Sequence, residues 1–176
     1  MTQSNAANKA TGRRFRHATM RDLPQMQKIY ARARALMAAN GNPTQWGDHF
    51  PPQELLEEDI DSNRLFLYLV NGELEGVFAF ILGPDPTYAR IEDGKWLNDT
   101  LPYGTIHRLA SSGTVRGVSR ACFDFCTGLS DYVRVDTHAD NRAMQAAIEG
   151  YGFRKCGNIY ASSGTLRTAY DYVREG

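Results

Sequence analysis

The sequence has no excess of charge of either sign. Its 20 lysines and arginines balance 20 aspartates and glutamates, so the formal net charge is zero. Proteins that attract nucleic acid or an anionic membrane through their overall field carry a clear positive excess. We therefore expect neither nucleic acid nor a membrane to be a partner of this chain.

Long apolar runs are also missing. No stretch approaches the eighteen or so consecutive apolar residues that a membrane-spanning helix needs. The polar N-terminus is not followed by the apolar segment of a secretory signal. These two absences predict a cytoplasmic protein.

Cysteine is scarce, and its three copies are an odd number that makes no disulfide framework. Cys122 and Cys126 lie four residues apart, but no histidine or further cysteine stands nearby in sequence to complete a zinc site. We expect no bound metal and predict buried thiols in a reducing compartment.

The apolar content, by contrast, is ordinary. Hydrophobic residues make up 42% of a 176-residue chain, which is long enough to bury one proper core. Residues 1–12 are small and polar, which predicts a disordered tail. Residues 13–176 are expected to form a single domain.

Apolar periodicity and turn residues predict alternating strands and helices. The expected strands span residues 14–18, 64–70, 74–82, 105–111, 132–138, 152–160 and 166–173. The expected helices follow Thr19, span residues 52–60, follow Gly117 and follow Asp140 or Asn141. This order predicts an α/β fold with a central sheet of mixed direction flanked by helices. An exposed last strand would permit a homodimer.

One stretch, residues 105–126, carries the main functional signal. A strand leads into a loop that contains Gly113 and Gly117, and the loop leads into a helix. Such a unit directs free backbone N–H groups at one spot, where the helix dipole favours an anion. The phosphates of a nucleotide-like cofactor fit this site, and Arg116 and Arg120 flank Gly117. The alternative is a simple turn.

With these elements in this order, residues 13–174 resemble the GCN5-related N-acetyltransferase (GNAT) family, most densely over residues 106–153. The family's phosphate pattern Gln/Arg-x-x-Gly-x-Gly/Ala stands here as Thr114-Val115-Arg116-Gly117-Val118-Ser119, of which only the central glycine is kept. The strand ending Asp136-Thr137-His138-Ala139-Asp140-Asn141, and Gly152-Phe153 after the next helix, also match.

The segments Trp46 to Pro51 and His107 to Ala110 are similar to those of a bacterial subgroup without assigned substrates. The resemblance implies an acyl-CoA N-acyltransferase fold with a mostly antiparallel sheet, and acetyl-CoA as the acyl donor. It also implies an N-acetyltransferase that moves the acetyl group directly to a primary amine, on either a small molecule or a peptide.

The resemblance also implies where acetyl-CoA would bind. The backbone of Leu109, Ala110 and Ser111 would run beside the pantetheine arm and supply the N–H donor for the developing oxyanion. Asn141 caps the following helix and, by resemblance, also contacts CoA. The diphosphate would lie on Thr114, Val115, Arg116, Gly117, Val118, Ser119 and Arg120.

The amine must lose a proton before it attacks, so a general base is required. Asp136 is the first candidate, although it could instead pair with Arg134 on the same face of its strand. His107 is the second, with a core histidine as the alternative, and His138 is the third. Arg108 is interpreted as a solvated strand charge.

The family's general acid is not kept at its usual position here. Many members place a tyrosine seven residues after the equivalent of Asn141, but Ile148 stands at that position. Tyr151 is the remaining candidate acid and would need a shifted backbone. This departure favours a second hypothesis, a module that binds acyl-CoA with little or no turnover.

Candidates for the acceptor pocket are one loop tryptophan and three residues of later segments. Each has core packing as its alternative. They are Trp46, Tyr88, Trp96 and His138.

Overall fold

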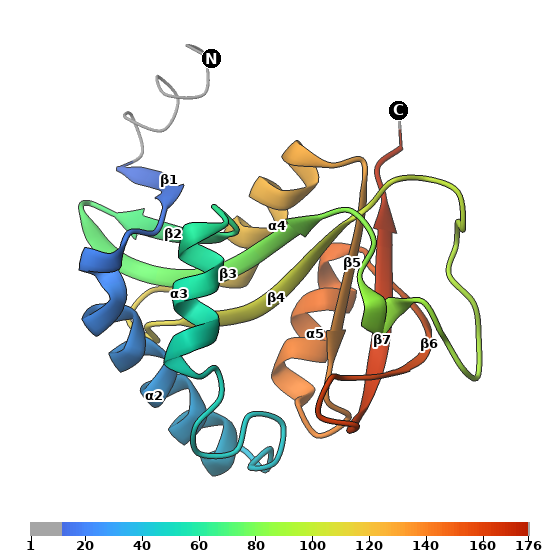
Figure 1. The fold of residues 1–176 in the computed structure, drawn as a ribbon, viewed down its shortest axis with the longest axis horizontal. Helices are drawn as coiled ribbons and strands as arrows, with labels where there is room; N and C mark the ends of the chain where they lie inside the picture. Colours follow the sequence, from blue (N-terminus) through green and yellow to red (C-terminus); the bar gives the residue numbers. More distant parts are fainter. Residues whose placement is uncertain (1–11, 176) are drawn as a thin grey trace.

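The computed structural model describes residues 12–175 and contains one seven-stranded sheet (Figure 1). Its strands are β1 (Arg13–His17), β2 (Leu65–Val70), β3 (Glu73–Leu82), β4 (Gly104–Ser111), β5 (Tyr132–Thr137), β6 (Arg154–Tyr160) and β7 (Leu166–Val173). Their order across the sheet is β1-β2-β3-β4-β5-β7-β6. Every neighbouring pair is antiparallel except β4 and β5, which are parallel. The predicted mixed, mostly antiparallel sheet is confirmed.

Helices cover both faces of this sheet. They are α2 (Leu23–Ala39), α3 (Gln53–Asp61), α4 (Val118–Leu129) and α5 (Arg142–Tyr151), with short 3-10 helices η1 (Met20–Asp22) and η2 (Pro86–Tyr88). A capping box precedes the first helix, because Thr19 and Asp22 bond reciprocally. Arg16 of β1 donates two hydrogen bonds of 2.8 Å to Asp22, and these bonds are the main reason that the pKa of Asp22 is lowered to about 2.

Three apolar clusters fill the space between the layers. On one face, α2 and α3 pack on β2 and β3 through residues such as Met26, Tyr30 and Leu56. On the opposite face, α4 and α5 pack over Phe78, Val133 and other strand residues. The third cluster joins the excursion of residues 83–103 to β6 and β7. The face covered by α2 and α3 is therefore shared with this excursion, and β4 and β5 lie between the two coverings.

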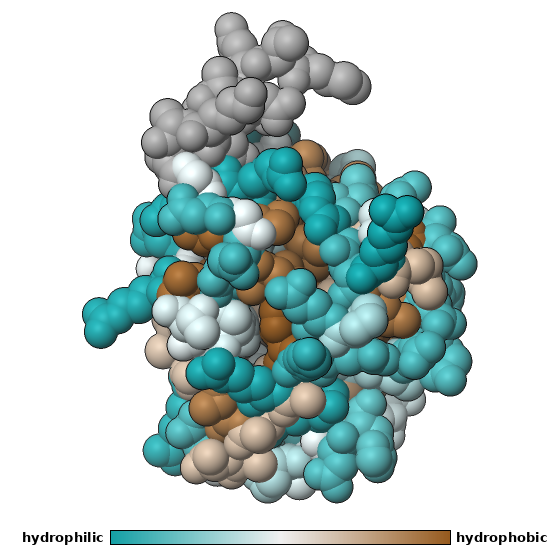
Figure 2. Space-filling view, turned by 90° about the vertical axis from the view of Figure 1, so that its left-hand side faces the viewer, coloured by the Kyte–Doolittle hydropathy of each residue, from teal (hydrophilic) through white to brown (hydrophobic). Residues whose placement is uncertain are grey.

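The prediction of buried thiols is confirmed. Cys122, Cys126 and Cys156 are buried, free thiols. Within residues 12–175 no cluster of three or more histidine, cysteine or acidic side chains could hold a metal ion. No helix in this part of the chain has the length and apolar character to cross a membrane. Figure 2 shows the side formed by the first half of the chain, where polar residues surround smaller apolar areas.

Two expectations about the ends of the chain need separate comment. The predicted disordered tail, residues 1–12, lies outside the described residues except for Gly12. The prediction that the last strand lies exposed at an edge is wrong, because β7 lies between β5 and β6. Strand order depends on contacts between distant segments, and β6 is the edge strand instead. Residue Glu92 of the excursion forms a bridge to Asn158 of β6.

Candidate active site

The two central strands separate in the middle of the sheet. β4 and β5 pair only from Gly104 with Val133 to Ile106 with Val135, although β4 continues to Ser111. From His107 onward, the edge of β4 that faces β5 has no strand partner. Backbone N–H and C=O groups must find partners when they are buried. This gap therefore offers an unpaired strand edge to an extended ligand, and a cavity of about 640 Å³ opens there.

A β-bulge lies at the same place on β4. Arg108 and Leu109 both oppose Phe78 of β3, and Arg108 has a φ of +55°. The Tyr30 hydroxyl of α2 donates to the Arg108 carbonyl at 2.7 Å. The Arg108 guanidinium pairs at 2.7 Å with the fully buried Asp59 of α3. The interpretation of Arg108 as a solvated charge is wrong, because its guanidinium pairs with a buried carboxylate. These contacts fix the bulge.

The glycine loop ends in an uncapped helix. Gly117 is the N-cap of α4, with a φ of +81° and no side-chain capping bond. Among residues 12–175, the N–H groups of Val118, Ser119 and Arg120 have no hydrogen-bond partner. A Cβ atom added to Gly117 would meet no atom within 4 Å. The first turn of α4 therefore presents free amides to open space, which is the geometry of an anion site.

The start of this loop is fixed by a buried carboxylate. Glu75 of β3 accepts hydrogen bonds from the hydroxyls of Ser112 and Thr114. The side chain of Thr114 therefore points toward Glu75, and only its backbone is left for the predicted diphosphate site. The guanidinium of Arg32 in α2 lies over Gly113, where an added Cβ would meet it at 3.2 Å. This cation beside the loop was not identified from the sequence.

His107 faces the cavity and is held by an aspartate. Its Nε2 lies 2.6 Å from Oδ2 of Asp85, which follows β3. Asp85 also accepts from the N–H and the hydroxyl of Thr87, at 2.9 and 2.7 Å. Burial raises the pKa of Asp85, but the hydrogen bonds from His107 and Thr87 outweigh it and lower that pKa to about 2. The imidazole is therefore fixed by a carboxylate that stays ionised.

This pair predicts a pH effect on stability. Because the folded pKa of Asp85 lies below its ordinary value, its ionised form stabilises the fold above about pH 4, and this contribution is lost as the pH falls toward 2. We expect the stability difference between wild type and Asp85→Asn to shrink by about 2 kcal/mol between pH 5 and pH 2.5. Urea unfolding at several pH values measures it. If the free energies of unfolding of the two proteins changed with pH in parallel, the role assigned to ionised Asp85 would be wrong.

Asp136 of β5 also lines the cavity, and its partner is a tyrosine. Tyr88 donates to Oδ1 of Asp136 at 2.6 Å. Burial, and then the negative charge of Asp136, raise the pKa of Tyr88 well above its ordinary value. The alternative partner Arg134 is ruled out, because its guanidinium lies 4.0 Å from the ring centre of Trp96 and 3.9 Å from that of Tyr103. Asp136 is thus free of an arginine partner within its own strand.

Two predicted acceptor-pocket residues pack in the core instead. Tyr88 and Trp96 are buried, and the indole N–H of Trp96 donates to the Tyr88 carbonyl at 3.1 Å. Neither side chain is part of the cavity lining. The prediction is wrong for Trp96, and Tyr88 reaches the site only through its bond to Asp136. His138 also lies outside the lining, with Nδ1 accepting from the Asp140 N–H at 3.0 Å.

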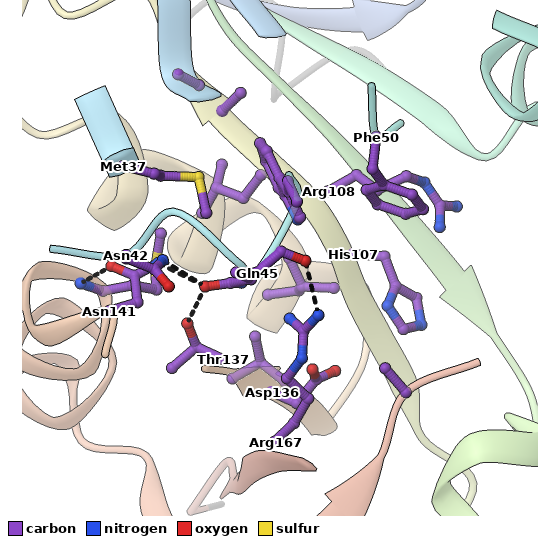
Figure 3. A pocket seen from close by; sticks show the side chains of 18 of the residues that line it. Met37, Asn42, Gln45, Phe50, His107, Arg108, Asp136, Thr137, Asn141 and Arg167 are labelled. Atoms are coloured by element: carbon purple, nitrogen blue, oxygen red, sulfur yellow. Dashed lines mark hydrogen bonds between the residues drawn. The ribbon is translucent and has the colours of Figure 1, made fainter. Parts of the chain in front are cut away.

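The loop of residues 41–52 forms one wall, and Gln45 is its anchor (Figure 3). The Gln45 side-chain oxygen accepts from Asn42 at 2.9 Å and from Asn141 at 3.1 Å. Its backbone carbonyl accepts from Arg167 of β7 at 2.9 Å. Trp46 lines the cavity from this loop and also packs against Tyr30, so both interpretations of this residue stay open. Gln45 thus ties the loop to both β7 and the start of α5.

The predicted helix cap at Asn141 is confirmed. Its Oδ1 accepts from the Met144 N–H at 3.2 Å, while its side chain also lines the cavity. Asn141 can therefore cap α5 and face a ligand at once.

Tyr151, the candidate acid, is misplaced for that role. Its hydroxyl donates to Asp124 at 2.9 Å and lies 3.0 Å from the Thr127 hydroxyl, both on α4. Its ring packs against Phe123, outside the cavity lining. Ile148 is fully buried in the same cluster. Within residues 12–175, no tyrosine lines the cavity.

The cavity thus brings together eight of the eighteen predicted site residues. Those in its lining are Trp46, His107, Leu109, Ala110, Ser111, Ser119, Asp136 and Asn141. The lining residues that the sequence does not identify include Gln45, Asp85 and Arg167. Asp85 stands in a Gly-Pro-Asp-Pro turn and Arg167 in a strand, and neither local pattern indicates a site.

Comparison with known proteins finds similar solved structures. No protein-family model and no curated protein matches the sequence. Among solved structures, a GNAT family acetyltransferase from Streptococcus agalactiae is 29% identical, with a TM-score of 0.85 over 94% of this chain and 97% of that one. The chain is thus similar in sequence and in fold to a GNAT family acetyltransferase.

Two further acetyltransferase structures share the fold at lower identity. An acetyltransferase of the family from Listeria monocytogenes is 19% identical, with a TM-score of 0.68 over 92% of this chain and 94% of that one. The yncA protein of Salmonella typhimurium, solved with its cofactor acetyl-CoA, is 12% identical, with a TM-score of 0.60 over 93% and 95% of the two chains.

Proposed function

We propose that the protein is an N-acetyltransferase that moves the acetyl group of acetyl-CoA directly to a primary amine. One observation carries this proposal. A single cavity extends from Ser119, at the uncapped start of α4, along the unpaired edge of β4 to His107 and Asp85. The same cavity thus contains the uncapped helix start, the unpaired strand edge and the imidazole that is bound to a carboxylate.

The residues present fit acetyl-CoA. The free amides of Val118, Ser119 and Arg120 would hold the diphosphate, with Arg32 beside the loop. The unpaired edge of β4 would bond to the amides of the pantetheine arm. The bulge turns the backbone at Leu109, whose N–H would stabilise negative charge on the carbonyl oxygen. When bound, acetyl-CoA supplies a reactive thioester.

His107 is the general base in this proposal. Histidine has an ordinary pKa of about 6.5 and aspartate one of about 3.9, so histidine matches proton transfer at neutral pH better. Asp85 fixes the orientation of the imidazole, as the third group of a catalytic triad does. Asp136 then attracts the protonated amine before it is deprotonated. His107 takes one proton from the amine as the N–C bond forms.

The departing thiolate needs a proton as the C–S bond breaks. No tyrosine lines the cavity within the described residues, so no side chain of the expected kind supplies that proton. His107 holds the proton taken from the amine and can return it to solvent or to the thiolate. The proton balance is then closed without a dedicated acid.

The experiment is thiol release from acetyl-CoA in the presence of a panel of amines, together with calorimetry of CoA binding. We expect binding of CoA and amine-dependent release of free thiol. Binding without thiol release for any amine would support the acyl-CoA-binding module instead. The lack of a cavity tyrosine is the observation that favours this second function. Absence of CoA binding would contradict both.

A further inference from the structure

Arg167 is a buried cation without an ion pair. It is 7% exposed, and within residues 12–175 no carboxylate lies within 4.0 Å of its guanidinium. Its Nη2 donates to the Gln45 carbonyl at 2.9 Å and to the Thr165 hydroxyl at 3.3 Å. Its Nη1 has no hydrogen-bond partner among the same residues. A buried charge with neutral partners only is costly, and burial accordingly lowers the pKa of Arg167.

This cation lies next to an anion on the cavity wall. Asp136 of β5 pairs with Ala169 of β7, so Arg167 occupies the diagonal position on the same face of the sheet. Figure 3 shows the two side chains next to each other, with His107 close by. Both residues line the cavity, yet they form no salt bridge with each other. The wall thus offers one positive and one negative group on neighbouring strands.

We propose, on the basis of the function proposed above, that the acceptor is a free α-amino acid. The guanidinium of Arg167 binds its carboxylate through the unused Nη1, and Asp136 attracts its ammonium group. His107 lies on the strand next to Asp136 and takes the proton. The N-terminus of a protein has an uncharged amide where the amino acid has its carboxylate, and it leaves Arg167 without a counterion.

The loop of residues 41–52 indicates the kind of side chain. Trp46 and Phe50 line the cavity beside the Gln45 carbonyl that holds Arg167. An amino acid whose carboxylate lies on Arg167 therefore has an aromatic wall available for its own side chain. We expect amino acids with apolar side chains to be better acceptors than those with charged ones.

The first test compares matched acceptors with the wild-type protein. Each L-amino acid is assayed beside its α-carboxamide and beside the amine that lacks the carboxyl group. The carboxamide has the more weakly basic amine, so a site without a carboxylate contact would favour it. We expect kcat/KM to be at least tenfold higher for the amino acid. Carboxamides or peptides that are acetylated as well as the amino acids, or better, would overturn the inference.

The second test changes the cation. Arg167→Met should lower kcat/KM for the amino acid by about tenfold to a hundredfold and leave the carboxamide within a few-fold. Arg167→Lys keeps the charge and should retain part of the preference, which controls for misfolding of the first variant. The matched control is Arg154→Gln, which changes an exposed arginine of β6 outside the cavity. It should leave the ratio of kcat/KM for the amino acid to kcat/KM for the carboxamide unchanged. An unchanged ratio in Arg167→Met would contradict the proposal.

The two proposals fail in different ways. If amines or peptides release thiol but free amino acids do not, the enzyme stands and the amino-acid acceptor is wrong. If no amine of any kind releases thiol, the proposed enzyme fails, and the inference about its acceptor fails with it.

Discussion

A glutamate at Gly117 should abolish measurable CoA binding while the protein stays folded. The position is open, since an added Cβ would meet no atom within 4 Å. The new carboxylate would lie beside the free amides of Val118 and Ser119 and would take the place of the diphosphate. Hydrogen bonds to charged groups contribute about 1.5–3 kcal/mol each, so losing two of them lowers affinity by a hundredfold or more.

The matched control separates charge from backbone strain. Gly117 has a φ of +81°, a conformation that asparagine tolerates better than other side chains. Gly117→Asn therefore tests the strain without adding charge, and we expect it to bind CoA within about fivefold of wild type. Calorimetry with CoA measures affinity, and thermal unfolding checks that both variants are folded. Wild-type affinity in Gly117→Glu would mean that the diphosphate lies elsewhere.

The sequence predicts the glycine loop and the helix after it because these features are local. The loop, its two glycines and the helix are consecutive, so periodicity and turn chemistry could place them. The same holds for the caps at Thr19 and Asn141, which depend on residues three positions away. Interactions of this range are visible in one sequence.

The acceptor side of the cavity depends on contacts that no local pattern contains. Asp85 meets His107 across 22 positions, and Gln45 meets Arg167 across 122. The error on Tyr151 has the same origin, since spacing could not show that this part of α5 faces α4 rather than the cavity. Arg108 is not a solvated charge, because a bulge and a buried partner on α3, Asp59, redirect its side chain. These features follow from tertiary packing.

His107→Gln should lower kcat by about a hundredfold to ten-thousandfold, the usual range for loss of a general base. Glutamine can still bond to Asp85, so the local structure should persist, but it cannot accept the proton. CoA affinity should be unchanged, because His107 is remote from the amides of α4 in the proposed binding mode. Steady-state kinetics and calorimetry measure these two quantities.

The comparison with Asp136→Asn decides between the two candidate bases. If Asp136 attracts the ammonium group, its variant should mainly raise KM for the amine, with kcat within about tenfold of wild type. The deficit of His107→Gln should also shrink as the pH approaches an amine pKa of about 10, because a neutral amine needs no base. The reverse pattern, a large loss of kcat in Asp136→Asn and a small one in His107→Gln, would make Asp136 the base.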